Sequence, residues 1–226
     1  MQPAEASPRP VLLELRLIRF DLSEEELLRR CAEARRLGVA SVLVAPADLD
    51  AAARALGGSS TVLGSIVDPQ GNLTTAIRQY AVRDALRRGA RIIEAAIPAG
   101  KMFSRHFQHV ESDLRQLVEP CRQQGAIFRL AVSPWTSNAE EFEILTARLA
   151  RRTGVDVVIS ADAEQAKRLL DLSKETYRVA WHAQPDPSGD MAAFERVSLE
   201  HDNPAEVMRR LNEPPMNQAG PSVPAE

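Results

Sequence analysis

Two charged side chains stand inside apolar runs of the sequence that are typical of strands. Glu94 lies within RIIEAAI (91–97), and Arg129 lies within AIFRLAV (126–132). Because side chains alternate between the two faces of a strand, each charge shares a face with apolar neighbours. A buried charge without a partner is costly, so we expect Glu94 and Arg129 to form an ion pair. Such a pair could serve as the acid–base and anion-binding groups of a catalytic site, or it could only hold the fold together.

Three further polar side chains accompany other strand-like runs. Arg19 closes the run 11–19, Arg178 lies in the run 177–181, and His182 follows that run directly. A guanidinium binds carboxylates, phosphates or developing oxyanions, and an imidazole can move protons near neutral pH. We therefore interpret Arg19, Arg178 and His182 as candidate binding residues.

Motifs for metals and common cofactors are missing from the sequence. His106 and His109 do not have the i, i+4 spacing of a zinc-binding helix, and they lack its acidic partner. The sequence contains no GxGxxG, GxxxxGK[ST] or GxSxG. We expect no metal and no cofactor, and these absences disfavour dinucleotide, P-loop and hydrolase chemistry.

Strand-like and helix-like segments alternate along most of the chain and would position these side chains. The expected strands are 11–19, 40–45, 61–67, 91–97, 126–132, 155–159, 177–181 and 195–199. The expected helices are 23–37, 47–56, 73–88, 104–123, 138–152, 162–171, a doubtful turn near 190–194, and 204–211. Such alternation predicts a parallel sheet covered by helices. Eight units favour an α/β fold of the closed (β/α)8 TIM-barrel type over an open doubly wound sheet, with an irregular or shortened region around units 7 and 8.

Composition predicts one globular domain with loose ends. We expect a barrel over residues 11–212 and disordered, Pro-rich segments at 1–10 and 213–226. A net charge of −3, mixed along the chain, favours neither nucleic acid nor a membrane as a partner. The charges in VLLELRLIRF (11–20) argue against a signal peptide, and Cys31 and Cys121 read as buried thiols, so we expect a cytoplasmic protein.

Several stretches of the sequence resemble a known family. They are SEEELLRRCAEARRLGVASVLVAPADL (23–49), DPQGNLTTAIRQYAVRDALRRGARIIEAAIPAGKM (68–102), FQHVESDLRQLVEPCRQQGAIFRLAV (107–132) and GVDVVIS (154–160). Together they resemble the deoxyribose-phosphate aldolases, which are class I aldolases with a (β/α)8 barrel. The resemblance covers roughly two thirds of the chain, and its motifs are moderately specific as a set and weak singly.

The resemblance implies that the imine-forming machinery of the family is changed in this chain. The Schiff-base lysine at the end of the sixth strand falls at Ile159, which cannot form an imine. The aspartate of the fourth strand falls at Glu94, and the lysine of the fifth strand falls at Arg129. The second lysine, on the seventh strand, falls at Val179 or, with a shift of one residue, at Arg178.

Other family positions also map onto charged residues of this chain. An acidic residue early in the first strand falls at Glu14, and a neighbouring threonine becomes Arg16. A lysine of the third helix falls at Arg78. The family's glycine-rich turns, which bind the substrate phosphate, have no counterpart in SADAEQAKRLL (160–170) or WHAQPDPSGDMAAF (181–194).

Two functions stay open at this point, and a third, a working deoxyribose-phosphate aldolase with its lysine in another register, is disfavoured because VDVVI (155–159) leaves little room for a shift. The first is a non-catalytic binding or assembly protein, with a small carbonyl or phosphorylated ligand, a protein partner or a second copy of the chain as its partner. The second is a lyase or isomerase that acts on a small carbonyl or sugar-phosphate compound, with Glu94 as general acid or base, arginines as anion clamps and His182 as proton shuttle. A relocated Schiff base is disfavoured, because nothing near Lys101 in the sequence would lower the pKa of its amine, and Lys167 and Lys174 are expected to face outward.

Overall fold

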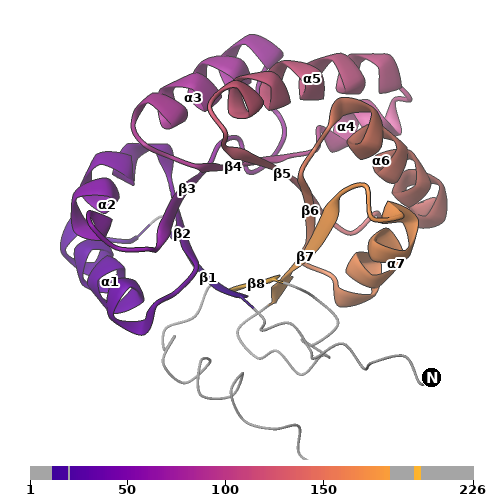
Figure 1. Cartoon of the computed structure of the whole chain (residues 1–226). Coiled ribbons are helices and arrows are strands. Elements are labelled where there is room, and N and C mark those ends of the chain that lie inside the picture. Colours follow the sequence, from indigo (N-terminus) through magenta and orange to yellow (C-terminus); the bar gives the residue numbers. More distant parts are fainter. Residues whose placement is uncertain (1–11, 20, 184–195, 200–226) are drawn as a thin grey trace, which may run out of the picture.

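Eight parallel strands close into a barrel whose order follows the sequence (Figure 1). The computed structural model describes residues 12–19, 21–183 and 196–199. The strands are β1 (Leu12–Leu17), β2 (Ser41–Val44), β3 (Val62–Ile66), β4 (Ile92–Ala96), β5 (Ile127–Val132), β6 (Val157–Ser160), β7 (Arg178–Ala183) and β8 (Arg196–Leu199). Because β8 pairs with both β7 and β1, the sheet has no free edge, and the expected TIM-barrel fold is confirmed.

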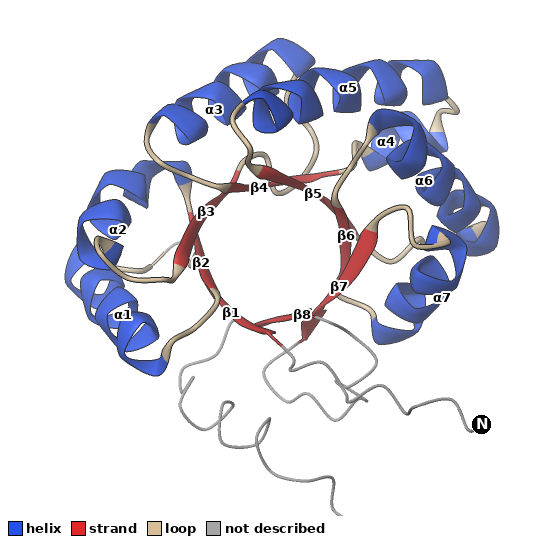
Figure 2. Cartoon of the chain, viewed as in Figure 1, coloured by secondary structure: helices blue, strands red, loops and turns tan. Residues whose placement is uncertain are grey.

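Seven α-helices of the described chain surround the strands (Figure 2). They are α1 (Glu24–Leu37), α2 (Leu49–Leu56), α3 (Thr75–Arg87), α4 (Ala99–Phe103), α5 (Phe107–Gln123), α6 (Ala139–Thr153) and α7 (Ala163–Ser173), with a 3-10 helix η1 (Pro46–Asp48) before α2. Local signals set the ends of several helices. The Ser23 hydroxyl accepts a hydrogen bond from the Glu26 amide at the start of α1, and Gly38 ends that helix in the left-handed region.

The helix expected over 104–123 begins later, at Phe107 of α5, and the short helix α4 (Ala99–Phe103) before it was not expected. Arg105 has a φ of 57°, which interrupts the helical backbone before α5 begins at Phe107. The segments expected at 1–10, 190–194, 204–211 and 213–226 lie outside the described residues, so the predicted ends and the last two helices stay predictions.

Apolar side chains fill the space on both sides of the strands. The larger cluster lies between the strands and the helices and includes Val42, Ile93 and Phe128. Two smaller clusters lie among the inward-facing residues: Leu43, Ile66 and Ile92 in one, and Val157, Ile159 and Ala180 in the other. Strands buried on both faces account for the continuous β-branched runs of the sequence. Within the described residues, no helix has the length and apolar character needed to cross a bilayer.

Candidate functional site

A cavity of about 150 Å³ opens at the carboxyl ends of the strands, where TIM barrels carry their sites. We call it the mouth cavity. Its polar lining residues are Arg16, Glu94, Ser133, Ser160 and His182. Its apolar walls are Ile66, Pro69, Ala96, Ala131, Val132, Ile159 and Ala161. The expected site residues Glu94 and His182 therefore meet at one cavity, and Ile159 lies in its wall.

An ion pair joins β1 to β5 through the interior of the barrel. Arg129 Nη1 donates to Glu14 Oε1 at 2.7 Å, and Nη2 donates to Glu14 Oε2, so the contact is bidentate. Both side chains are fully buried. The Ser41 hydroxyl donates a further hydrogen bond to Glu14. Paired and hydrogen-bonded in this way, the two charges are compatible with an interior position.

A second ion pair joins β1 to β4 nearer the mouth. Arg16 Nη1 lies 2.9 Å from Glu94 Oε2 and 2.8 Å from Oε1. The expected pair between Glu94 and Arg129 is therefore wrong. These two residues are register partners on adjacent strands, but β1 lies across the barrel from both (Figure 1). Side chains that extend inward from opposite walls meet end to end, and this gives the bidentate geometry at Arg129.

Burial changes the acid–base behaviour of His182. Burial lowers the pKa of its imidazole to about 4, and the nearby Arg16 charge acts in the same direction. The ring is consequently neutral at pH 7. In that form it can accept a proton or share a hydrogen bond, but it contributes no positive charge to the mouth cavity.

The two other candidate arginines do not line the mouth cavity. Arg19 Nε and Nη2 pair with Asp21 at 3.0 and 2.9 Å, and both side chains are about half exposed. Arg178 is exposed at the first residue of β7, and so lies at the opposite end of that strand from the mouth. Sequence reasoning used Arg16 only through the resemblance, although the alternating pattern LLELRL places Glu14 and Arg16 on one face of β1.

All three lysines of the chain are among the described residues, and none lines the mouth cavity. Lys101 lines a separate cavity of about 380 Å³ between the loop after β3 and the helices α4 and α5. Lys167 pairs with Glu164 at 3.1 Å on the outer face of α7. Lys174 follows the carboxyl end of α7.

A buried arginine forms the floor of the Lys101 cavity. Arg78 donates to Asp113 from Nη1 and to the Ala96 carbonyl from Nη2 at 2.6 Å, and its Nε lies 3.1 Å from Asp68 Oδ2. These contacts tie the loop after β3, the end of β4 and α5 together. Gly71 in the same loop has a φ of 66°, and a Cβ there would lie 2.5 Å from the Ile97 carbonyl oxygen.

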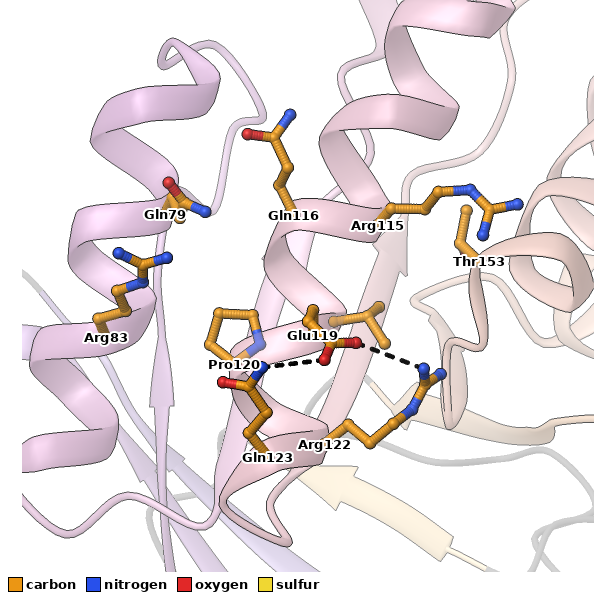
Figure 3. A pocket seen from close by; sticks show the side chains of 10 residues that line it. Gln79, Arg83, Arg115, Gln116, Glu119, Pro120, Arg122, Gln123 and Thr153 are labelled. Carbon is orange, nitrogen blue, oxygen red and sulfur yellow. Dashed lines mark hydrogen bonds and ion pairs between the residues drawn. The ribbon is translucent and has the colours of Figure 1, made fainter.

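A third hollow lies on the outer surface over α3, α5 and the end of α6 (Figure 3). Its charged side chains include Arg115, Glu119 and Arg122, which are more than half exposed. Glu119 accepts a hydrogen bond from Gln123 at 3.0 Å and lies 3.5 Å from Arg122 (Figure 3). No strand residue contributes to this groove, so it is separate from the strand ends where barrel sites form.

Other reactive groups of the described chain do not form a site. No set of three or more His, Cys, Asp or Glu residues in this part is arranged to hold a metal. Cys31 and Cys121 are buried and free, and burial raises their thiol pKa values to about 11 and about 12. Thiolates are the reactive form of cysteine, so both side chains act as core residues.

Comparisons with known proteins agree with the barrel. No family model matches the chain. A deoxyribose-phosphate aldolase from Streptococcus sanguinis is 29% identical over 143 residues, which are 63% of this chain and 64% of that protein. One from Clostridium kluyveri is 28% identical over 148 residues, 65% of this chain and 67% of the relative. The match thus spans about two thirds of these relatives' length.

Solved structures share the fold at lower sequence identity. A structure titled "QR15, an Aldolase" has a TM-score of 0.76 at 15% identity and covers 92% of this chain and 100% of its own. A putative deoxyribose-phosphate aldolase from Coccidioides immitis has a TM-score of 0.76 at 17% identity, with 84% and 80% covered. The sequence matches and the shared fold confirm the expected relationship to the deoxyribose-phosphate aldolase family.

Proposed function

We propose that this relative of the deoxyribose-phosphate aldolases binds a small polar ligand at the mouth cavity and does not form a Schiff base with it. The observation that carries the proposal is the lining of that cavity. Ile159 stands in its wall, at the position that the resemblance assigns to the imine-forming lysine. An imine requires a primary amine within bonding distance of the carbonyl carbon, and no lysine lines the cavity.

The remaining polar groups of the mouth are suited to binding more than to nucleophilic attack. The Ser160 hydroxyl already contacts the Gln165 side chain at 2.6 Å and receives a hydrogen bond from the Asp162 amide at 3.0 Å. It therefore organises the turn into α7, and none of its hydrogen-bond partners in the described part of the chain is a base. Arg16 and a neutral His182 supply hydrogen-bond donors and acceptors for a polar ligand.

A second candidate function is an acid–base lyase or isomerase that works without an imine. It is favoured by one observation, which is that Glu94, Arg16 and His182 line the same cavity. Glu94 would move a proton next to a carbonyl, Arg16 would stabilise the developing enolate oxygen, and His182 would exchange the proton with water. The ion pair to Arg16 opposes this function, because it occupies both carboxylate oxygens of Glu94.

Reductive trapping tests the first proposal. The full chain is treated with sodium borohydride in the presence of acetaldehyde, and adducts are mapped by peptide mass spectrometry. We expect no adduct that saturates with aldehyde concentration on any of the three lysines. The matched control is Lys101→Arg, which removes the lysine nearest the strand ends and is expected to leave the result unchanged. A saturable adduct on Lys101 that this variant abolishes would overturn the proposal.

Proton exchange distinguishes the two candidate functions. Incubation of small ketones and 2-oxo acids with the chain in deuterium oxide, followed by NMR, reports deuterium uptake next to the carbonyl. Uptake that disappears in Glu94→Gln and persists in Lys101→Arg would establish the acid–base function. Uptake equal to that of buffer supports a binding function only.

Self-association is a separate proposal. One structural relative, from Aeropyrum pernix, is titled a tetrameric deoxyribose phosphate aldolase and has a TM-score of 0.67 at 18% identity. We propose that this chain also forms a homo-oligomer, and light scattering coupled to size-exclusion chromatography measures it. A monomer mass near 24.8 kDa at all concentrations would refute this proposal.

A further inference from the structure

We propose that the ligand of the mouth cavity is a small carboxylate, of the 2-oxo or 2-hydroxy acid class, and that Arg16 is the residue that binds its carboxyl group. This inference rests on the proposed function, because it needs the mouth to be a ligand site.

Arg16 has nitrogens that make no hydrogen bond within the described part of the chain. Glu94 contacts only the Nη1 nitrogen, at 2.8 and 2.9 Å. Nε is buried and has no hydrogen-bond partner, and Nη2 makes no hydrogen bond in the described part of the chain. Nε and Nη2 lie on the same edge of the planar guanidinium, and this edge matches the two oxygens of a carboxylate. Arg16, which lines the cavity, therefore keeps two donor nitrogens that no group in the described part of the chain uses.

Burial makes these unfilled donors significant. Arg16 is 7% exposed, so its nitrogens are largely shielded from bulk water. Buried donors without partners are rare in folded proteins, and hydrogen bonds to charged groups are among the strongest. The Nε of Arg129 is also buried without a partner, but Arg129 uses both of its terminal nitrogens on Glu14 and does not line the mouth. Of these two interior arginines, only Arg16 is placed to receive an anion from outside.

The charges that line the cavity are balanced before a ligand binds. Arg16 and Glu94 cancel each other, and His182 is neutral because burial and Arg16 lower its pKa. A ligand carboxylate on the free edge of Arg16 would offset the positive potential that His182 feels. The imidazole could then take up a proton more readily, so binding of an anion and protonation of His182 favour each other.

Cavity size limits the ligand. A cavity of about 150 Å³ in another protein accommodates benzene, a molecule of six non-hydrogen atoms. The mouth cavity has the same volume, which suits an acid of three or four carbons and is small for a sugar phosphate. The apolar walls at Ile66, Ala131 and Ile159 suit the alkyl end of such an acid.

Calorimetry with two matched probes tests the inference. Pyruvate carries the carboxylate, and pyruvamide has nearly the same shape without the charge. We expect saturable binding of pyruvate and binding of pyruvamide about tenfold weaker or more, since one charge-assisted contact is lost. NMR of the His182 ring should show its pKa rising from about 4 when pyruvate is added and staying there when pyruvamide is added.

Two conservative variants assign the effect to Arg16. Arg16→Lys keeps a positive partner for Glu94 but removes the two-nitrogen edge, so pyruvate binding should weaken by about tenfold or more. Arg129→Lys makes the same change in the other interior ion pair and should leave pyruvate binding within about twofold. Circular dichroism checks that both variants fold. If Arg16→Lys does not fold, the comparison of pyruvate with pyruvamide and the His182 titration still decide the matter.

The outcomes separate this inference from the proposed function. Equal binding of pyruvate and pyruvamide, or unchanged pyruvate binding in Arg16→Lys, would overturn the carboxylate assignment and leave the mouth as a ligand site. Failure of both probes to bind would also overturn the assignment. The borohydride experiment tests the proposed function independently, because it reports a lysine adduct and not affinity.

Discussion

Replacing Arg129 with leucine tests whether the interior ion pairs are as dry as the barrel suggests. Arg129 and Glu14 are both fully buried, and their contact is bidentate. Arg129→Leu leaves the Glu14 carboxylate in an apolar interior without its guanidinium. Breaking a buried ion pair in this way costs about 3 to 5 kcal/mol, so the free energy of unfolding should fall by that amount.

A double variant separates the penalty of an unpaired charge from the contribution of the pair. Arg129→Leu combined with Glu14→Leu removes both charges and replaces them with apolar groups. Replacement of a whole buried pair is often neutral or stabilising, so the double variant should recover most of the loss. Arg19→Leu is the surface control, because its pair with Asp21 is about half exposed and should contribute less than about 1 kcal/mol.

Urea denaturation followed by circular dichroism and tryptophan fluorescence measures these differences. Arg129→Leu should be the most destabilised variant, the double variant should be next, and Arg19→Leu should be the least destabilised. If the free energy of unfolding of Arg129→Leu lies within about 1 kcal/mol of the wild-type value, water must reach Glu14. The interior of the barrel would then not be closed as described.

Three further expectations follow from single groups. Gly71→Ala should lower the free energy of unfolding by about 2 kcal/mol or more, since its φ is 66° and the added Cβ would meet a backbone oxygen at 2.5 Å. Gly58→Ala, with a φ of 73° and open space, should lower it by about 1 kcal/mol. Equal losses of both variants in urea denaturation would refute the clash. Cys31 and Cys121, with thiol pKa values raised to about 11 and about 12, should resist Ellman's reagent at pH 8 until urea is added, and rapid native labelling would contradict their burial. The unfolded state should bind a proton at His182 near pH 6.5 and the folded state only near pH 4, so the free energy of unfolding should fall by up to about 3 kcal/mol as the pH drops through that window. If the free energy of unfolding depends on pH in the same way in His182→Asn, another group causes the fall.

The barrel could be predicted because its signals are local. Apolar β-branched runs mark the strands, and caps such as Ser23 and Gly38 mark the helix ends. The short helix α4 and the turn after it could not be predicted, because the turn depends on a positive φ at Arg105, a residue type that gives no such signal. The sequence pattern therefore predicts a helix from residue 104, whereas α5 begins at Phe107.

The candidate site was predictable by position but not by partner. Alternation grouped Glu94 and Arg129 with apolar neighbours on one face of each strand, and the structure turns both faces into the barrel, where the register pairs the two residues. Register describes neighbours along the sheet, whereas the contacts of long side chains in a closed barrel run across it to β1. Arg16 was therefore missed as a site residue, although its alternation with leucine was visible in the sequence.

The pairing of Glu94 with Arg16 also bears on the isoleucine at position 159. By the resemblance, the family holds a cation at the end of the sixth strand and a threonine where this chain has Arg16. In this chain the sixth strand contributes Ile159, while β1 contributes a guanidinium that contacts the acid of β4. A carboxylate buried in the interior needs a cation, and Arg16 supplies it from the opposite wall. The interior charges of the barrel are thus balanced without a lysine in β6. The cation is Arg16, whose guanidinium stays protonated and can bind an anion but cannot form an imine.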